Sequence, residues 1–280
     1  MRPKLLASYF TFAGDVIPLR SDAPSPLDFR DRVETVTRAG FTSIGIFHTD
    51  LPKIIARYGY DGMRGILADN GIERLELEAM IDWFADGERR VRSDRTRELL
   101  LRTAEALNAY QIKAVGDAVS DCPVPAMIEA FGEMADQARS CGARLSIEVM
   151  AGSNIADLRR AMEIIEGAER PDTGVMLDIW HFVRGGIPFT EIAALPKARI
   201  MGVELNDGLL ASEGTAFEDT VFRRRFCGEG EFDVGGFIAA VEATGYDGPF
   251  GIEVLSNAVR AMPLDTVARR AFETTRSMFA

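Results

Sequence analysis

The stretch RLSIEVM at residues 144–150, followed by GVMLDIWH at residues 174–181, decides the fold of this chain. Each is a short run rich in Val, Ile and Leu with a carboxylate near its end, and a helical pattern at residues 155–167 separates the two. Short apolar runs that alternate with helices are typical of buried parallel strands. The same unit recurs with RIMGVELN at residues 199–206 and GPFGIEVLS at residues 248–256. The C-terminal half is therefore predicted to be a series of strand–helix units.

The N-terminal half repeats this alternation. Further strands are predicted at residues 5–12, 41–48, 72–80 and 111–118, and further helices at residues 28–39, 51–69, 93–109, 123–141, 189–194, 233–244 and 264–279. Eight strands alternating with eight helices predict an α/β chain folded as a (β/α)8 TIM barrel. The length of 280 residues suits one such barrel, and no Pro/Ser/Gly-rich linker divides the sequence, so a single domain over residues 1–280 is expected.

Composition excludes several kinds of partner. A net charge of −11 would repel phosphate backbones, so nucleic acid is not expected to bind. No run of about 18 uninterrupted apolar residues exists, which excludes a membrane span. Three cysteines without C-x-x-C spacing indicate neither disulfides nor a zinc knuckle, and they favour a reduced, cytoplasmic location. The first 14 residues are interpreted as leading into a barrel strand instead of as a signal peptide. The oligomeric state stays open, a homo-oligomer included.

Four acidic residues mark the expected active site: Glu148, Asp178, Glu204 and Glu253, each near the end of a predicted strand. In TIM barrels the carboxyl ends of all strands meet at one mouth, where the chemistry takes place. A buried ionised carboxylate is costly unless a cation or a donor compensates it. These four residues are therefore predicted to bind one divalent cation, and the chain is predicted to be a metal-dependent enzyme with a small-molecule substrate.

The two histidines of the chain both fall at predicted strand ends. His181 follows Asp178 by three residues and is expected to face the mouth and contact substrate or metal, the alternative being a capping or packing role. His48 closes the second predicted strand, and a site role and a core role are both open. Asp207 follows the seventh strand and is expected to hold a loop or a neighbouring cation. The long segment 208–231 is typical of a functional loop such as a lid.

Taken together, SIEVM, LDIWH, VELND and RRRFCGEGEFD followed by GYDGPFGIEV resemble the xylose-isomerase-like TIM barrels, which include sugar isomerases, ketose 3-epimerases and inosose dehydratases. The resemblance implies one cation, commonly manganese, magnesium or cobalt, bound by Glu148, Asp178 and Glu253. Glu204 stands where the family usually has His or Gln. The resemblance also implies that Arg224, with Arg225 one residue away, contacts substrate.

The departure at Glu204 changes the expected charge of the site. Four carboxylates carry a formal charge of −4 against +2 for the cation, so the ligand set is hard and anionic. Mn²⁺ or Mg²⁺ is therefore expected in preference to zinc, with Co²⁺ as a further option. Asn154 stands where ketose epimerases have another Glu, so it is a candidate substrate-binding residue that fits an epimerase less well.

The family chemistry predicts proton transfer next to a carbonyl. A cation chelated by a hydroxy-ketone stabilises an enediolate, and Glu148 and Glu253 on opposite sides of the ring could remove and return a proton. This predicts an isomerase or epimerase that acts on a keto-sugar or related polyol. One alternative is a dehydratase or lyase on a keto-inositol, keto-sugar or cyclic keto-acid, with His181 protonating the departing oxygen. A third is a non-catalytic sugar-binding protein or subunit.

Overall fold

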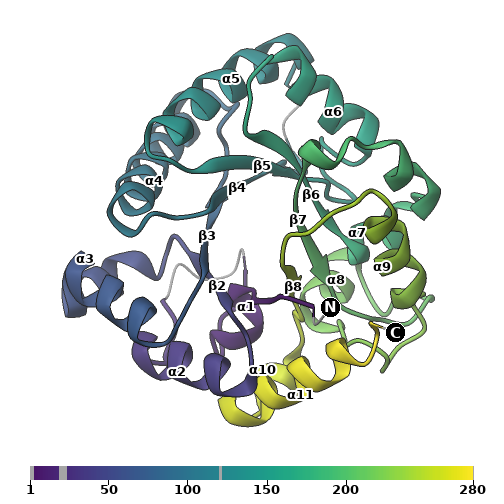
Figure 1. The fold of residues 1–280 in the computed structure, drawn as a ribbon. Helices are drawn as coiled ribbons and strands as arrows, with labels where there is room; N and C mark the ends of the chain where they lie inside the picture. Colours follow the sequence, from purple (N-terminus) through teal and green to yellow (C-terminus); the bar gives the residue numbers. More distant parts are fainter. Residues whose placement is uncertain (1–2, 19–23, 120–121, 280) are drawn as a thin grey trace.

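The computed structural model describes residues 3–18, 24–119 and 122–279. Its parallel strands close into a barrel in sequence order, and the last strand pairs with the first. The strands are β1 (Leu5–Ala7), β2 (Ser43–Phe47), β3 (Arg74–Met80), β4 (Gln111–Val115), β5 (Arg144–Glu148), β6 (Thr173–Asp178), β7 (Ile200–Leu205) and β8 (Phe250–Ile252). Figure 1 shows these strands as an inner ring with the helices outside it. The predicted (β/α)8 TIM barrel is confirmed.

Seven of the eight predicted helices are present among the described residues, whereas residues 189–194 form a 3₁₀ helix, and short helices that were not predicted follow β1, β6, β7 and β8. The helices are α1 (Tyr9–Phe12), α2 (Phe29–Ala39), α3 (Leu51–Asp69), α4 (Gly87–Leu107), α5 (Val124–Ser140), α6 (Leu158–Gly167), α7 (Ile179–Gly185), α8 (Ala216–Phe222), α9 (Val234–Ala243), α10 (Asn257–Arg260) and α11 (Leu264–Arg276), with 3₁₀ turns η1 (Phe189–Ala194) and η2 (Lys197–Arg199). Among these helices, none combines the length and the apolarity needed to cross a membrane. The predicted start of α4 at residue 93 was wrong, because the helix begins at Gly87.

Alternation along each strand separates an apolar outer layer from a polar interior. In β3, Leu75 and Leu77 belong to the main hydrophobic core, whereas Glu76 and Glu78 alternate with them and contact polar residues of other strands inside the barrel. Successive side chains of a strand point to opposite faces, so one strand supplies both layers. The interior of this barrel is therefore charged where most barrel interiors are apolar.

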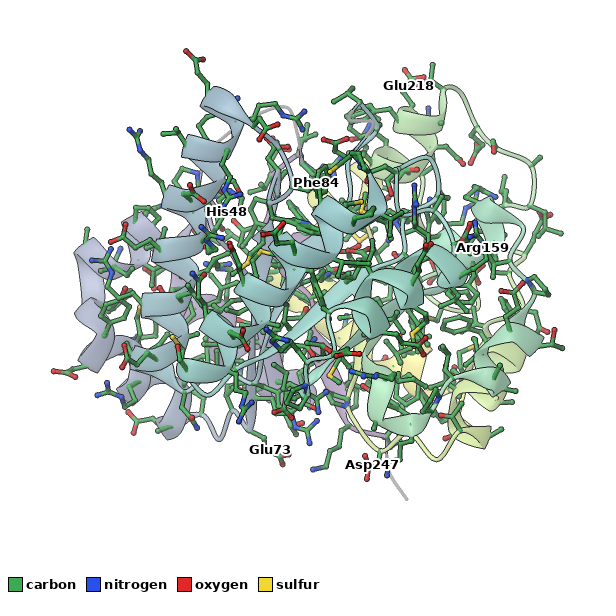
Figure 2. All side chains as sticks on the ribbon, turned by 90° about the horizontal axis from the view of Figure 1, so that it is seen from above. His48, Glu73, Phe84, Arg159, Glu218 and Asp247 are labelled. Atoms are coloured by element: carbon green, nitrogen blue, oxygen red, sulfur yellow. The ribbon has the colours of Figure 1, made fainter. Side chains whose placement is uncertain are left out.

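The two ends of the barrel are distinct. Figure 2 shows His48 and Phe84, which follow strands, toward one end, and Glu73 and Asp247, which precede strands, at the other. The first of these ends is the mouth at which the loops that follow the strands meet.

Several strands end earlier than predicted, and β1 and β8 fall furthest short. β1 stops at Ala7, because Tyr9 and Phe10 turn into α1 and pack with Phe47 and Leu255 in a small apolar cluster. β8 stops at Ile252 and covers only the centre of the strand that was expected over residues 248–256. These short strands leave more chain at the mouth, where it can form the site.

β6 also ends early, at Asp178. The Asp178 carboxylate accepts a hydrogen bond of 2.9 Å from the backbone N–H of Trp180 and thereby caps α7. Such a cap satisfies one of the free N–H groups of a helix start. His181 therefore lies in the first turn of α7 and not on the predicted strand at residues 174–181.

Asp207 organises the segment between β7 and α9. Its buried carboxylate accepts backbone N–H bonds of 2.8–3.0 Å from Gly208, Gly228, Gly230 and Phe232. A Cβ at Gly230 would lie 2.3 Å from the Asp207 carboxylate, so only glycine fits there. The expectation that Asp207 holds a loop is confirmed.

Replacement of Asp207 by Ala should destabilise the protein by about 3 kcal/mol, because several charge-assisted hydrogen bonds are lost together. Urea unfolding would measure this, and limited proteolysis should show new cleavage within residues 208–231. The matched control is Asp233→Ala, which removes one capping bond to Gly236 and should cost about 1 kcal/mol. Equal losses in the two variants would contradict the organising role of Asp207.

Candidate metal centre

The four predicted acids meet at the mouth of the barrel. One oxygen from each of Glu148, Asp178, Glu204 and Glu253 lies within 4.8 Å of the other three, and all four residues are buried. Glu148 and Asp178 end β5 and β6, Glu204 lies in β7, and Glu253 directly follows β8. The carboxylates thus converge as predicted, and their role as cation ligands stays a prediction.

Arg224 enters this group of acids directly. Its Nη1 donates to Asp178 Oδ2 at 2.7 Å and to Glu253 Oε2 at 3.0 Å, and the residue is 2% exposed. The backbone around it is fixed, since the Arg224 N–H donates to the carbonyl of Leu255 and the flanking Arg225 pairs with Asp207. Arg224 therefore lies beside the predicted ligands, and its contact with substrate stays a prediction.

Lys113 is a second buried cation, which the sequence reasoning missed. It projects from β4 into the barrel, and its Nζ lies 2.9 Å and 3.0 Å from the two oxygens of Glu204. Nζ also lies 3.1 Å from Glu78, 3.6 Å from Glu148 and 4.0 Å from Glu253. A lysine in the middle of the apolar run QIKAV was the available signal, because a buried lysine needs a carboxylate partner.

The interior carries more negative than positive charge. Six buried acids, namely Glu76, Glu78, Glu148, Asp178, Glu204 and Glu253, face two buried cations, Lys113 and Arg224, so the formal charge is −4. Burial, together with neighbouring acids, raises the pKa of Glu148 and the pKa of Glu76 to about 8 each. Hard oxygen donors with uncompensated negative charge are what Mg²⁺ and Mn²⁺ prefer. The residues therefore fit a divalent cation.

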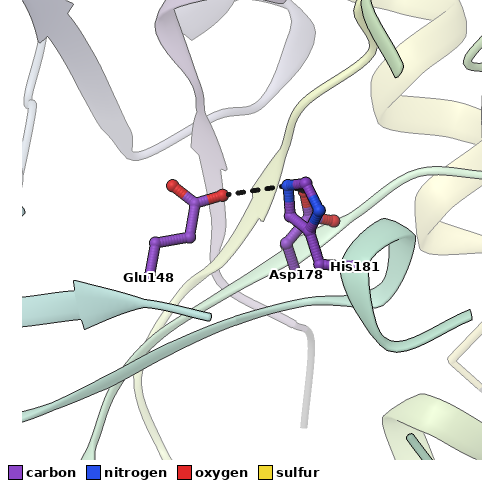
Figure 3. Close-up of side chains that lie close together, drawn as sticks. All are labelled: Glu148, Asp178 and His181. Carbon is purple, nitrogen blue, oxygen red and sulfur yellow. Dashed lines mark ion pairs between the residues drawn. The ribbon is translucent and has the colours of Figure 1, made fainter. Parts of the chain in front are cut away.

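His181 adjoins the acids from the first turn of α7. Its Nε2 lies 3.6 Å from Glu148 Oε1 and 3.8 Å from Asp178 Oδ2, and Figure 3 shows the ring facing Glu148. The backbone N–H of Ala151 donates to Nδ1 at 3.2 Å. Burial lowers the pKa of His181 to about 4, so the ring is neutral at pH 7 and its proton lies on Nε2. The ring is therefore a hydrogen-bond donor at the site.

Three predicted substrate contacts have other described partners. His48 Nδ1 accepts the N–H of Ala79 at 3.4 Å. Asn154 accepts the N–H of Asp117 at 3.0 Å and so joins the loops after β4 and β5. Arg225 is about 40% exposed at its side chain and lies 3.8 Å from Glu213. None of these contacts joins the group of four acids, and the substrate roles stay predictions.

Comparison with known proteins gives the family and the fold. A family model described as xylose isomerase-like TIM barrel matches residues 33–278. The 3-dehydroshikimate dehydratase of Pseudomonas aeruginosa is 30% identical over 245 residues, and that of Pseudomonas putida is 27% identical over 244 residues. Each alignment covers 83% of this chain and 37% of the relative, so the chain spans little more than a third of those proteins.

A solved structure of the IOLI protein with a bound zinc atom superposes with a TM-score of 0.84 at 17% identity. The superposition covers 98% of this chain and 97% of that one. At this identity the likeness supports the fold alone.

The charge surplus predicts a pH-dependent stability of the metal-free protein. A buried acid whose folded pKa is raised from 4.5 to about 8, as for Glu76, stabilises the fold below pH 4.5, and this contribution is lost as the pH rises through 8. Between pH 6 and pH 9 the melting temperature should fall by roughly 5–10 °C, and Glu76→Gln should remove about half of that fall.

Differential scanning calorimetry in the presence of a chelator measures this. The control is Glu73→Gln, whose exposed side chain pairs with Lys4 and which should melt like the parent at each pH. A parent melting temperature that does not change with pH would contradict the prediction.

Proposed function

This chain belongs to the xylose isomerase-like TIM barrel family, and we propose that it is a divalent-metal-dependent lyase that removes water from a cyclic hydroxy-keto acid. The observation that carries the proposal is the position of His181, whose Nε2 lies 3.6 Å from a Glu148 oxygen while the N–H of Ala151 donates to its Nδ1. This pair places a base and a hydrogen-bond donor at the same side of the site. The names of the two Pseudomonas relatives support the same reaction class.

Glu148, Asp178 and Glu253 are the proposed ligands, with Mn²⁺ or Mg²⁺ as the proposed cation and Co²⁺ as a further option. When bound, the cation would polarise the substrate carbonyl and make the neighbouring C–H acidic. Asp178 suits a ligand role because its Oδ1 is held by the Trp180 N–H and by Asn206, at 2.9 Å and 2.7 Å. Its Oδ2 therefore faces the site in a fixed orientation.

Glu148 has two oxygens with different neighbours. Oε2 lies 3.6 Å from Lys113, whereas Oε1 lies 3.6 Å from His181. We assign the proton transfer to this carboxylate. A bound cation would lower its raised pKa and keep it ionised, so that it can take the proton from the carbon next to the carbonyl. The electron pair of that C–H bond forms the C=C bond as the C–O bond to the β-hydroxyl breaks.

The proton then passes from Glu148 to the departing hydroxyl, which leaves as water, so the reaction needs no oxidant or co-reactant. His181 donates a hydrogen bond from its Nε2–H to the departing oxygen, and the proton stays on the ring. The sequence predicts that His181 protonates the departing oxygen. We assign it a hydrogen bond instead, because an imidazole with a pKa of about 4 is already neutral at pH 7 and has no second ring proton to give. Arg224, beside the ligands, suits the substrate carboxylate by its charge and planar shape.

An isomerase or epimerase is the second candidate. Glu253 lies in the same group of acids as Glu148. Glu148 ends β5 and Glu253 follows β8, so the two carboxylates approach from different strands, which suits proton delivery to the opposite face of a substrate. Against this, Glu253 Oε2 accepts from Arg224 at 3.0 Å, and Asn154 supplies an amide where a further acid would favour epimerisation.

The substrate class is tested with 3-dehydroshikimate and a panel of keto-sugars and inososes, each with added MnCl₂. We expect mass spectrometry to show loss of one water from the keto-acid, abolished by EDTA and restored by Mn²⁺. Epimer formation from a keto-sugar would replace the lyase proposal by the second candidate. Binding of a sugar without turnover would favour the non-catalytic reading.

Replacement of His181 by Asn should lower kcat by roughly 10²–10³ because a positioned donor is lost, while one Mn²⁺ per chain is retained. Glu148→Gln, in contrast, should lower both turnover and metal content, because a ligand and the base are lost together. Steady-state kinetics and elemental analysis of the same samples separate these effects. Loss of metal from the Asn variant would make His181 a ligand instead.

A further inference from the structure

We infer that Lys113 is a permanent counter-cation of the metal centre and that Glu204 serves this lysine, so that Glu204 is a positioning residue and not a metal ligand. The inference rests on the metal site of the proposed function. It assigns a role to Lys113 and removes one of the four predicted ligands.

The hydrogen bonds of Glu204 support this assignment. Both of its oxygens accept from Lys113 Nζ, at 3.0 Å for Oε1 and 2.9 Å for Oε2. Oε1 also accepts from the hydroxyl of Ser8 at 2.9 Å. Charge-assisted hydrogen bonds to a lysine are among the strongest that a carboxylate makes. Glu204, which is completely buried, therefore accepts three hydrogen bonds without a cation, two of them from one lysine.

The position of Lys113 makes this pairing permanent. Its side chain is 1% exposed and extends from the centre of β4, so it is shielded from solvent. Its Nζ is nearest to the two oxygens of Glu204, at 2.9 Å and 3.0 Å, followed by Glu78 at 3.1 Å, Glu148 at 3.6 Å and Glu253 at 4.0 Å. Breaking a buried pair leaves an uncompensated charge in the interior, which is strongly destabilising. Lys113 is thus paired with both oxygens of Glu204 and has Glu78 as a further neighbour, and we count Lys113 and Glu204 as one ion pair.

Formal charges also favour three carboxylate ligands, with Glu204 as the partner of Lys113. With Lys113 and Glu204 counted as a neutral pair, Glu148, Asp178 and Glu253 contribute −3 and Arg224 contributes +1. A divalent cation brings the sum over these six residues to zero, while Glu76 and Glu78 add −2 to the rest of the interior. The earlier count of four acids against one cation gave −2, because it lacked both buried basic residues. Three carboxylate ligands, Arg224 and one internal ion pair therefore match the charge of one divalent cation.

A mutant cycle tests the pairing: Lys113→Met, Glu204→Met and the double variant. In metal-free protein, each single change should lower the melting temperature by roughly 10 °C, because one buried charge loses its partner. The double variant should recover most of that loss. Additive losses in the double variant would overturn the inference.

Titration of the metal-free proteins with MnCl₂ tests the ligand assignment. The double variant should bind one Mn²⁺ with a Kd within about fivefold of the parent, whereas the ligand control Asp178→Asn should weaken binding more than about 100-fold. A double variant that loses Mn²⁺ like Asp178→Asn would make Glu204 a ligand and overturn the inference. Should Lys113→Met fail to fold, Lys113→Gln with Glu204→Gln gives the same comparison.

A remote buried pair provides the stability control. Arg32 pairs with Asp50 in the interior near α2, and Asp50→Asn should lower the melting temperature while leaving the Mn²⁺ affinity unchanged. These experiments also distinguish a failure of this inference from a failure of the proposed function. A parent that binds Mn²⁺ but removes water from no substrate overturns only the lyase proposal, and a double variant without Mn²⁺ affinity overturns only the role given to Glu204.

Discussion

The ammonium group of Lys113 is the charge around which the interior of this barrel is organised. It lies within 4.0 Å of carboxylates from β3, β5 and β7 and from the residue after β8. A buried lysine is stable only beside acids, and the acids are stable only beside a cation. The ring of strands therefore encloses a set of charges that depend on one another, while the outward side chains supply the apolar core.

The second buried cation reaches the site by a different route. Arg224 does not project from a barrel strand but from a short segment that pairs with Asp207 and with Ser256. The backbone hydrogen bonds that Asp207 accepts fix this segment over the mouth. A carboxylate outside the metal centre thus determines where a guanidinium inside it lies. The two cations differ accordingly, since one belongs to the rigid barrel and the other to a loop.

Asp178 links the end of a strand to the chemistry of the site. One oxygen caps α7, and the other faces Arg224 and the convergent acids. Because the cap starts the helix immediately after the strand, His181 turns its ring toward Glu148. Whether a proton then returns to a departing hydroxyl or to the opposite face of the substrate depends on this local arrangement more than on the fold, which hosts many reactions.

The sequence by itself determined the barrel and the convergence of Glu148, Asp178, Glu204 and Glu253. Both follow from local patterns, because strand–helix periodicity is local and parallel strands of a closed barrel end at one mouth. Only the tertiary structure decided the partners of these acids. Lys113 and Glu204 are 91 residues apart, and their contact depends on the register and closure of the whole ring. Alternation along one strand fixes which side a residue faces, but it carries no information on which distant charge it meets.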